Sequence, residues 1–359
     1  MKIEIRETRV ICNNPDNPKN GYFGWPSVER LKNGRLAMVA SGFRMAHVCP
    51  FGKGIICYSE NEGKTWTRPA VVIDTPLDDR DCGILAFDES SVMITSFNNK
   101  IETQRGWNSE RKDPYIEGYL DTVDAEKAEE RFLGSTFVIS EDNGVTFGPV
   151  KRIPISSPHG PCLNENGEIL YVGCQFFCKD SGNEEDTLAL CKVNRDGSYE
   201  LMSTIANVAS ELLNCEPHAI VMPDGKIIVH IRVQGRYEDK NYFTTYQSES
   251  TDGGKSFSEP HRILELTGGA PAHLLLLRDG TLISTYGYRN APYGIRMMYS
   301  KDGGETWNTN NVLYDEGQSG DLGYPASVQL DNDDILTVFY ENIDGISVIK
   351  QIIWNFIEE

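Results

Sequence analysis

The chain has 359 residues, of which 39% are hydrophobic and 24% are charged, as in an ordinary soluble globular protein. Its net charge of −19, from 53 acidic against 34 basic residues, argues against nucleic acid or an anionic membrane as a partner, because either would be repelled. An acidic small substrate is not excluded, since a few clustered arginines reverse the field locally.

The N-terminal stretch MKIEIRETRVICNN alternates apolar and charged residues and lacks the apolar core of a signal peptide. No segment reaches the roughly 18 apolar residues that a membrane span needs. Nine cysteines, an odd number, are scattered along the chain and favour free thiols in a reducing compartment. We therefore expect a cytoplasmic protein, and the sequence leaves its oligomeric state open.

A hairpin pattern recurs along the chain: an apolar strand, a short turn and a second apolar strand. Its copies are WPSVERLKNGRLAMVAS, DCGILAFDESSVMITSF, HGPCLNENGEILYVG, EPHAIVMPDGKIIVHIR, APAHLLLLRDGTLISTYG and YPASVQLDNDDILTVFY. The turn positions are Gly34, Ser90, Gly167, Gly225, Gly280 and Asp333. All intervals but one lie between 53 and 58 residues, a period typical of one four-stranded blade per repeat.

The longer interval, between Ser90 and Gly167, contains YIEGYLDTVDAEKAEERFLG, whose composition and period predict a helix inserted in or beside the second blade. GISVIKQIIW near the C-terminus would give the last blade a third strand, and KIEIRETRVI at the N-terminus its fourth. We therefore predict an all-β fold, a single six-bladed β-propeller domain over residues 1–359 that the N-terminal strand closes.

A second motif lies between the hairpins, in the copies YSENEGKTW, ISEDNGVTF, STDGGKSF and YSKDGGETW, with a degenerate copy VNRDGSY. An Asp or Asn side chain that bonds its own backbone, followed by a Gly with positive φ, makes a stiff turn, after which the aromatic residue packs into the blade. The motif resembles the Asp-box, or BNR, repeat of the sialidase superfamily, and the resemblance covers nearly the whole chain. It implies the propeller fold and a glycosidase activity.

The first strand of each propeller blade lines the central channel, so residues at the start of these strands should surround one opening. Counting back nine positions from each turn gives Trp25, Asp81, Pro158, Glu216, Pro271 and Tyr324.

The resemblance implies roles for three residues. In sialidases a Glu opens one blade and an Arg ends its second strand, a pattern that Glu216 and Arg232 match; the final-blade Tyr corresponds to Tyr324 in GYPASVQL. Arg232 would bind a substrate carboxylate, and Glu216 would polarise Tyr324 as the nucleophile. A phenol suits this task because the anomeric carbon of a sialic acid bears a carboxylate, which repels an anionic nucleophile.

The chain departs from the sialidase pattern at the first of three arginines, where Gly24 stands, followed by Trp25 at the mouth. The other candidates for binding the carboxylate are Arg44, Arg289 and Arg296. The loss of one arginine therefore leaves open either a sialic acid or a different acidic sugar as the substrate.

The general acid is also open, because the loop after the second strand of blade one has His47 and no Asp. Asp81 is the first candidate and His47 the next, while the other polar residues expected near the mouth are Asp79, His159 and His218. Neither Cys215 with His218 nor Cys174 with Cys178 supplies four metal ligands, and no cofactor is implied.

The leading hypothesis is a glycoside hydrolase that resembles exo-α-sialidases and releases a terminal acidic sugar with retention, Tyr324 acting as the nucleophile. A second is a glycosidase or lyase for another anionic sugar such as a uronic acid, in which Tyr324 or a histidine removes a proton next to the carboxylate. A third is a non-catalytic propeller that binds a glycan or a protein at the same mouth. Separately, Glu216 and Arg232 could form a structural salt bridge between strands. The fold alone does not choose among them.

Overall fold

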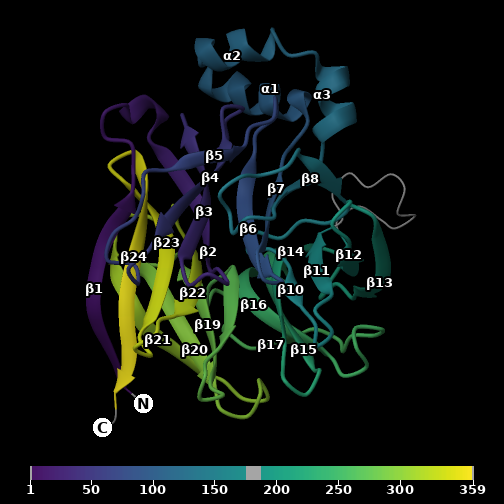
Figure 1. Ribbon diagram of the computed structural model, residues 1–359, viewed down its shortest axis with the longest axis vertical. Coiled ribbons are helices and arrows are strands. Elements are labelled where there is room, and N and C mark those ends of the chain that lie inside the picture. The colour runs from purple at the N-terminus through teal and green to yellow at the C-terminus, as the bar shows by residue number, and fades with distance from the viewer. Residues whose placement is uncertain (1, 175–186, 358–359) are drawn as a thin grey trace.

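The computed structural model describes residues 2–174 and 187–357, and within these residues the strands form six four-stranded antiparallel sheets (Figure 1). The sheets are the blades of a β-propeller, as the recurring hairpins predict. Each is an up-and-down meander, so the first strand of one blade follows the last strand of the blade before it.

Apart from the N-terminal strand, the strands of the six blades succeed one another along the chain. Blade one contains β2 (Tyr22–Arg30), β3 (Leu36–Arg44), β4 (Lys53–Ser59) and β5 (Ala70–Ile73), after the 3-10 turn η1 (Pro18–Asn20). Blade two contains β6 (Arg80–Phe87), β7 (Ser91–Phe97), β8 (Ser135–Ser140) and β9 (Lys151–Ile153). Blade three contains β10 (Cys162–Leu163), β11 (Ile169–Cys174), β12 (Leu188–Val193) and β13 (Tyr199–Ile205).

Blade four contains β14 (Leu212–Val221), β15 (Ile227–Tyr237), β16 (Lys240–Ser250) and β17 (His261–Arg262). Blade five contains β18 (Ala272–Leu276), β19 (Leu282–Tyr288), β20 (Tyr293–Ser300) and β21 (Asn308–Gly317). Blade six contains β22 (Leu322–Gln329), β23 (Ile335–Ile343), β24 (Ile346–Ile357) and, from the N-terminus, β1 (Lys2–Cys12).

The N-terminal strand closes the ring, as predicted, because β1 pairs with β24 from Lys2 opposite Ile357 to Cys12 opposite Ile349. It is the outer strand of its blade and most of its side chains are exposed or half-buried. Charged side chains on such an edge strand disfavour pairing with another chain.

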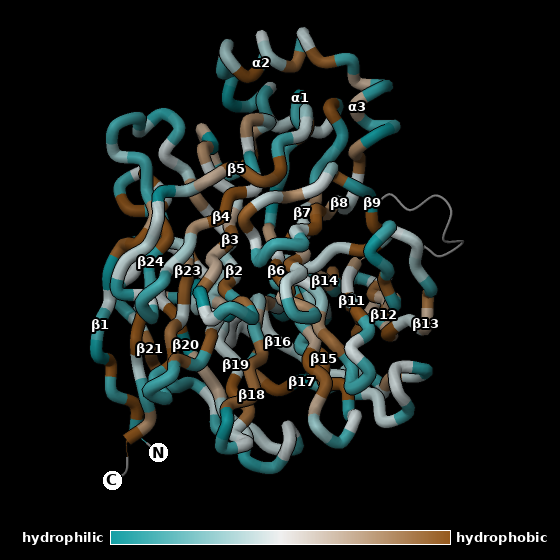
Figure 2. The backbone as a smooth tube through the Cα atoms, viewed as in Figure 1, coloured by the Kyte–Doolittle hydropathy of each residue, from teal (hydrophilic) through white to brown (hydrophobic). Residues whose placement is uncertain are grey.

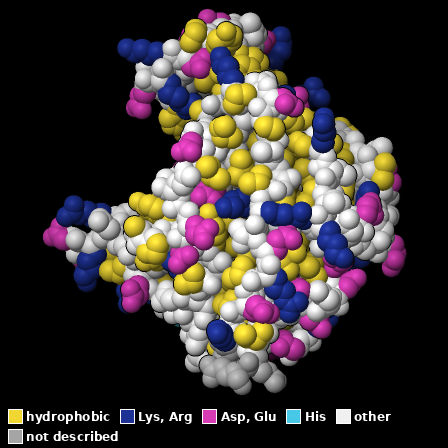
Figure 3. All heavy atoms as spheres, turned by 90° about the vertical axis from the view of Figure 1, so that its left-hand side faces the viewer, with side chains coloured by type: hydrophobic (Ala, Val, Ile, Leu, Met, Phe, Trp, Pro, Cys, Tyr) yellow, Lys and Arg dark blue, Asp and Glu magenta, His cyan; other side chains and the backbone are white. Residues whose placement is uncertain are grey.

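The hydrophobic core lies between neighbouring blades, where the apolar faces of adjacent sheets meet. Met38 of blade one packs in a cluster with Val338 of blade six, and Val39 packs with Ile84 of blade two. The other blade pairs bury equivalent clusters, and Figure 2 shows hydrophobic residues along the strands and hydrophilic ones in the loops. Figure 3 shows acidic side chains interspersed with basic ones on one face of the molecule.

The predicted helical insertion lies between β7 and β8 of blade two, but it is larger than expected. Its helices are α1 (Ile101–Arg111), α2 (Pro114–Leu120) and α3 (Ala125–Phe132). The expected single helix over residues 115–134 is split because Asp124 accepts a hydrogen bond from the Lys127 N–H and starts a new helix. In Figure 1 the helices stand at one end of the molecule, beyond the strands of blades one and two.

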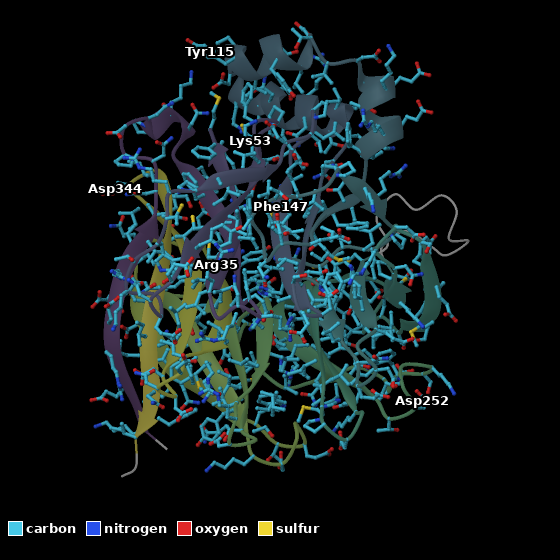
Figure 4. The ribbon with its side chains drawn as sticks, in the orientation of Figure 1. Arg35, Lys53, Tyr115, Phe147, Asp252 and Asp344 are labelled. Atoms are coloured by element: carbon cyan, nitrogen blue, oxygen red, sulfur yellow. The ribbon has the colours of Figure 1, made fainter. Side chains whose placement is uncertain are left out.

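The Asp-box turns join the third and fourth strands of their blades, which agrees with their predicted position between the hairpins. In the second copy Asp142 accepts hydrogen bonds from the Thr146 N–H at 2.8 Å and the Thr146 hydroxyl at 2.6 Å. Asp252, labelled in Figure 4 on an outer loop of blade four, makes the same contacts in the third copy. The two tryptophans do more than pack: Trp66 and Trp307 donate to Gln351 and Gln247 of the preceding blades, each at 2.8 Å.

No helix in residues 2–174 and 187–357 is long and apolar enough to cross a membrane.

Candidate active site

The polypeptide bends sharply where the first strands of blades one, two, four and six begin. Trp25, Asp81, Glu216 and Tyr324 have positive φ angles of 56°, 44°, 48° and 50°. Each lies at a shift of register between the first and second strands of its blade. A residue with a β-carbon costs about 1–2 kcal/mol in this conformation, and such bulges redirect side chains at functional sites. The sequence predicts the position of these residues but not their strained backbone.

Glu216, Arg232 and Tyr324 form one hydrogen-bonded group. The Tyr324 hydroxyl donates to Glu216 Oε1 at 2.5 Å, and Arg232 Nη1 donates to Glu216 Oε2 at 2.5 Å and to the Tyr324 oxygen at 3.1 Å. Gln234 holds the other side of the guanidinium, which also lies 4.8 Å from the centre of the Phe243 ring. A Glu, a Tyr and an Arg from blades four and six therefore meet as the resemblance implies.

The electrostatics of this group keep the phenol protonated in the free protein. Burial, and then the Glu216 carboxylate, raise the pKa of Tyr324 well above its ordinary value, while Arg232 and Arg289 oppose the rise. If the Tyr324 oxygen reacts as a nucleophile, another group must therefore take its proton. The Glu216 carboxylate, which already accepts the hydrogen bond from this hydroxyl, is placed to do so.

Of the other predicted arginines, Arg289 lies nearest to this group. Its guanidinium carbon lies 5.8 Å from the centre of the Tyr324 ring and 5.2 Å from that of Phe243, and its Nε donates to the Leu322 carbonyl. Arg296, on the third strand of blade five, instead donates to the Tyr314 carbonyl at 2.7 Å.

Arg44 and its partner Asp78 are fully buried, and Arg44 Nη1 lies 2.6 Å from Asp78 Oδ1. Asp78 also accepts a hydrogen bond from Gln104 of α1, so the pair joins blade one to the helical insertion. The Arg44 guanidinium carbon lies 4.9 Å from the centre of the Trp25 ring.

Arg80 is an additional cation at the mouth that the sequence analysis did not single out. Its guanidinium carbon lies 4.6 Å from the centre of the Trp25 ring, and its Nε lies 4.0 Å from Asp81 Oδ1. A β-carbon at Gly24, the position of the missing arginine, would lie 3.3 Å from the Tyr22 ring and 3.8 Å from the Tyr340 ring. Tyrosines thus occupy the direction in which an arginine at this position would start. The signal for Arg80 was its place next to Asp81 in LDDRDCG.

The two predicted carboxylates of blade two differ in their surroundings. Asp79 accepts hydrogen bonds from the Thr75 N–H at 2.7 Å and its hydroxyl at 2.9 Å, which caps a turn. Asp81 lines a cavity of about 130 Å³ together with Glu216, Arg232 and Phe97, and its Oδ1 has no hydrogen-bond partner among the described residues. Burial raises the pKa of Asp81 to about 7, and the nearby Glu216 charge adds to this rise.

Three imidazoles lie together inside the ring: His159, His218 and His273, with ring centres 4.3 to 5.5 Å apart. His218 accepts a hydrogen bond from the Leu274 N–H and His273 accepts one from the Ser327 N–H, so both link first strands of neighbouring blades. Burial lowers the pKa of all three, which keeps them neutral. His273 was not predicted, although it occupies the position in APAHLL that His218 occupies in CEPHAI.

His47 lies at the mouth, with its ring centre 5.0 Å from that of Trp25. Trp25 in turn lies 6.4 Å from Tyr324, also between ring centres. Within the described residues no group of three or more His, Cys, Asp or Glu side chains is placed to hold a metal ion, and Cys178 lies outside them.

Comparisons with known proteins agree with this fold. Residues 120–337 match the model of the BNR repeat-like domain. A protein of unknown function from Dyadobacter fermentans is similar at a TM-score of 0.77 and 23% identity, over 99% of each chain. The NanB sialidase of Streptococcus pneumoniae is similar at a TM-score of 0.70 and 12% identity, over 98% of this chain and 71% of that one.

An α-L-arabinanase of Penicillium chrysogenum is similar at a TM-score of 0.66 and 13% identity, over 97% of this chain and 98% of that one. A comparison with curated proteins gives no significant match. At these identities the structural neighbours show the fold alone, a propeller of the kind found in glycoside hydrolases. The family match covers more than half of the chain, and the protein belongs to the BNR repeat-like domain family.

Proposed function

We propose that the protein is a retaining glycoside hydrolase that releases a terminal acidic sugar, with Tyr324 as the nucleophile and Glu216 as its base. The observation that carries the proposal is the 2.5 Å hydrogen bond from the Tyr324 hydroxyl to Glu216, with Arg232 bonded to both residues. A plain core tyrosine needs neither a carboxylate partner nor a strained backbone. The glycosidases among the structural neighbours support the reaction class.

In the first step the Tyr324 oxygen bonds to the anomeric carbon, its proton passes to Glu216, and the bond from the anomeric carbon to the leaving oxygen breaks. The leaving oxygen takes a proton from a second group, for which the sequence candidates are Asp81 and His47. Water then cleaves the tyrosyl glycoside, giving one proton to that second group, while Glu216 returns its proton to Tyr324. Arg232 and Arg289 would hold the sugar carboxylate, with Arg80 in place of the arginine that is missing at Gly24.

The test is the release of 4-methylumbelliferone from its α-sialoside, β-glucuronide and α-arabinofuranoside by the wild type, Tyr324→Phe and Tyr286→Phe. Tyr286 is a matched control because it is a buried tyrosine of blade five whose hydroxyl bonds to Asn310. Turnover of an acidic glycoside that is lost in Tyr324→Phe alone supports the proposal. Full turnover in that variant refutes the mechanism, and acidic-glycoside binding without turnover in the wild type indicates a non-catalytic propeller.

The second candidate is a lyase for a uronic acid, which the departure at Gly24 favours because the first carboxylate-binding arginine of the sialidase pattern is missing there. In that reaction a base removes the proton next to the carboxylate and the glycosidic oxygen leaves. The product is unsaturated and absorbs in the near ultraviolet, so a polyuronate assay followed by absorbance separates the two reactions.

A further inference from the structure

A second hydrogen-bonded group at the mouth is centred on Asp321, which immediately precedes β22. The Tyr22 and Tyr340 hydroxyls donate to Asp321 Oδ1 at 2.9 and 3.0 Å, and Asn342 Nδ2 donates to Oδ2 at 2.9 Å. His47 Nδ1 lies 3.2 Å from Asp321 Oδ1 and 2.6 Å from the Tyr22 oxygen. Residues from blades one and six thus converge on one carboxylate.

This network favours one of the two neutral forms of the His47 ring, the one with the proton on Nδ1. The Asp321 carboxylate only accepts hydrogen bonds, and it lies within reach of both the Tyr22 hydroxyl and His47 Nδ1. A hydrogen bond from His47 to Asp321 requires the proton on Nδ1, and we infer this tautomer, with the Tyr22 hydroxyl donating to Asp321. In the neutral ring Nε2 then has a lone pair, and no described residue bonds to it.

His47 is also placed where a departing group can reach it. Its ring meets the Trp25 indole edge to face, and the same indole contacts the Tyr324 ring, so the indole links the imidazole to the nucleophile. The His47 side chain is 47% exposed, whereas Asp81 is 4% exposed inside the ring. The leaving oxygen is attached to the rest of the glycan, which extends toward solvent, so an open position suits the group that protonates it.

We propose that His47, held by Asp321, is the proton-transferring residue of this site, and this inference rests on the proposed glycosidase function. His47 Nε2–H gives its proton to the leaving oxygen as the bond to the anomeric carbon breaks. The neutral Nε2 then takes a proton from the water that cleaves the tyrosyl glycoside. Asp321 is a positioning residue, which orients the ring and stabilises the imidazolium.

The charged groups that face the imidazole determine its pH dependence. These are Asp321, Arg44 and Arg80, beside the neutral Tyr22. Partial burial lowers the pKa of His47 and the two arginines lower it further, while Asp321 opposes the change. Because the acid form is needed first, kcat/KM should fall as the pH rises through this pKa. Asp321→Asn removes the opposing carboxylate, so the descending limb should move to lower pH.

The first test needs no substrate. Imidazole nitrogen NMR spectra of the ¹⁵N-histidine-labelled full chain are compared for the wild type, His47→Gln and Asp321→Asn. His47→Gln serves to assign the His47 signals. We expect His47 to be the Nδ1–H tautomer with a pKa that falls in Asp321→Asn. An Nε2–H tautomer, or a pKa that does not change in Asp321→Asn, would overturn the inference.

The second test varies the leaving group in aryl α-sialosides, from acidic nitrophenols to weakly acidic phenols. His47→Gln should lose about 100-fold or more of kcat/KM on the weakly acidic phenols, which need protonation, and less than about tenfold on the nitrophenols. His261→Gln, an exposed histidine on the outer strand β17, is the matched control. If His47→Gln loses kcat/KM equally on all leaving groups, or loses none while Tyr324→Phe is inactive, this inference alone is overturned. A wild type that cleaves no glycoside overturns both proposals.

Discussion

Replacing Asp81 with asparagine should stabilise the folded protein by an amount that grows as the pH rises. Burial raises the pKa of Asp81 to about 7 in the folded protein, whereas an aspartate in the unfolded chain titrates near 3.9. The folded state therefore binds this proton more tightly. Its contribution to stability is fully present below about pH 3.9, decreases through the interval and is lost above about pH 7.

The pKa of Asp81 differs between the folded and unfolded states by about three units, and each unit corresponds to about 1.4 kcal/mol. At pH 8 the wild type is therefore about 4 kcal/mol less stable than a protein with a neutral side chain at this position. Asparagine has nearly the same shape and no charge. The attraction of Arg80, whose Nε lies 4.0 Å from Asp81 Oδ1, is already contained in the raised pKa and is not subtracted again. We expect Asp81→Asn to gain about 4 kcal/mol at pH 8 and close to nothing at pH 4.

The measurement is the free energy of unfolding in urea, followed by tryptophan fluorescence, at several values between about pH 4 and pH 8. Asp344→Asn is the control, because Asp344 also has a positive φ, 52°, but lies on an exposed loop (Figure 4). A gain in Asp81→Asn that does not change with pH, or an equal slope in Asp344→Asn, would refute the reasoning. The expected gain also means that the wild type keeps an acidic group at the site at the expense of stability.

Two further predictions concern the inside of the ring. Burial lowers the pKa of His273 to about 3, against about 6.5 in the unfolded chain, so its contribution to stability is present above pH 6.5 and is lost as the pH falls. Between about pH 6 and 4, the free energy of unfolding of His273→Gln should therefore fall by about 1.4 kcal/mol less per pH unit than that of the wild type. Gly83→Ala should cost about 3 kcal/mol, because its β-carbon would lie 2.3 Å from the Gly160 backbone nitrogen. Gly106→Ala, on α1 with no atom within 4 Å of the added carbon, should instead gain about 0.5–1 kcal/mol, and thermal unfolding of both variants checks this pair.

The sequence by itself determined the blades and the central pair of the site. A Gly or Asp in the left-handed conformation makes each hairpin turn. In each Asp-box turn an Asp or Asn side chain bonds the backbone of the same turn. Both motifs depend only on residues close in the sequence, and both repeat with the blade period. Glu216 and Arg232 lie on paired strands of one hairpin, so their spacing already places them near each other. The same logic underestimated the helical insertion, because α1 has few apolar residues and packs through Ile101, Gln104 and Asn108.

The tertiary structure alone decided which of the remaining charges belong to the mouth. Arg44 stands at a strand end like a ligand-binding arginine, and only the packing of α1 over Asp78 shows that its charge is paired in the interior. Asp321 is 299 positions from Tyr22 in the chain, yet they bond because closure of the ring places blade six against blade one. The sequence of one blade does not predict which side chains of another blade it will contact. The partner of His47 therefore exists only once the propeller has closed.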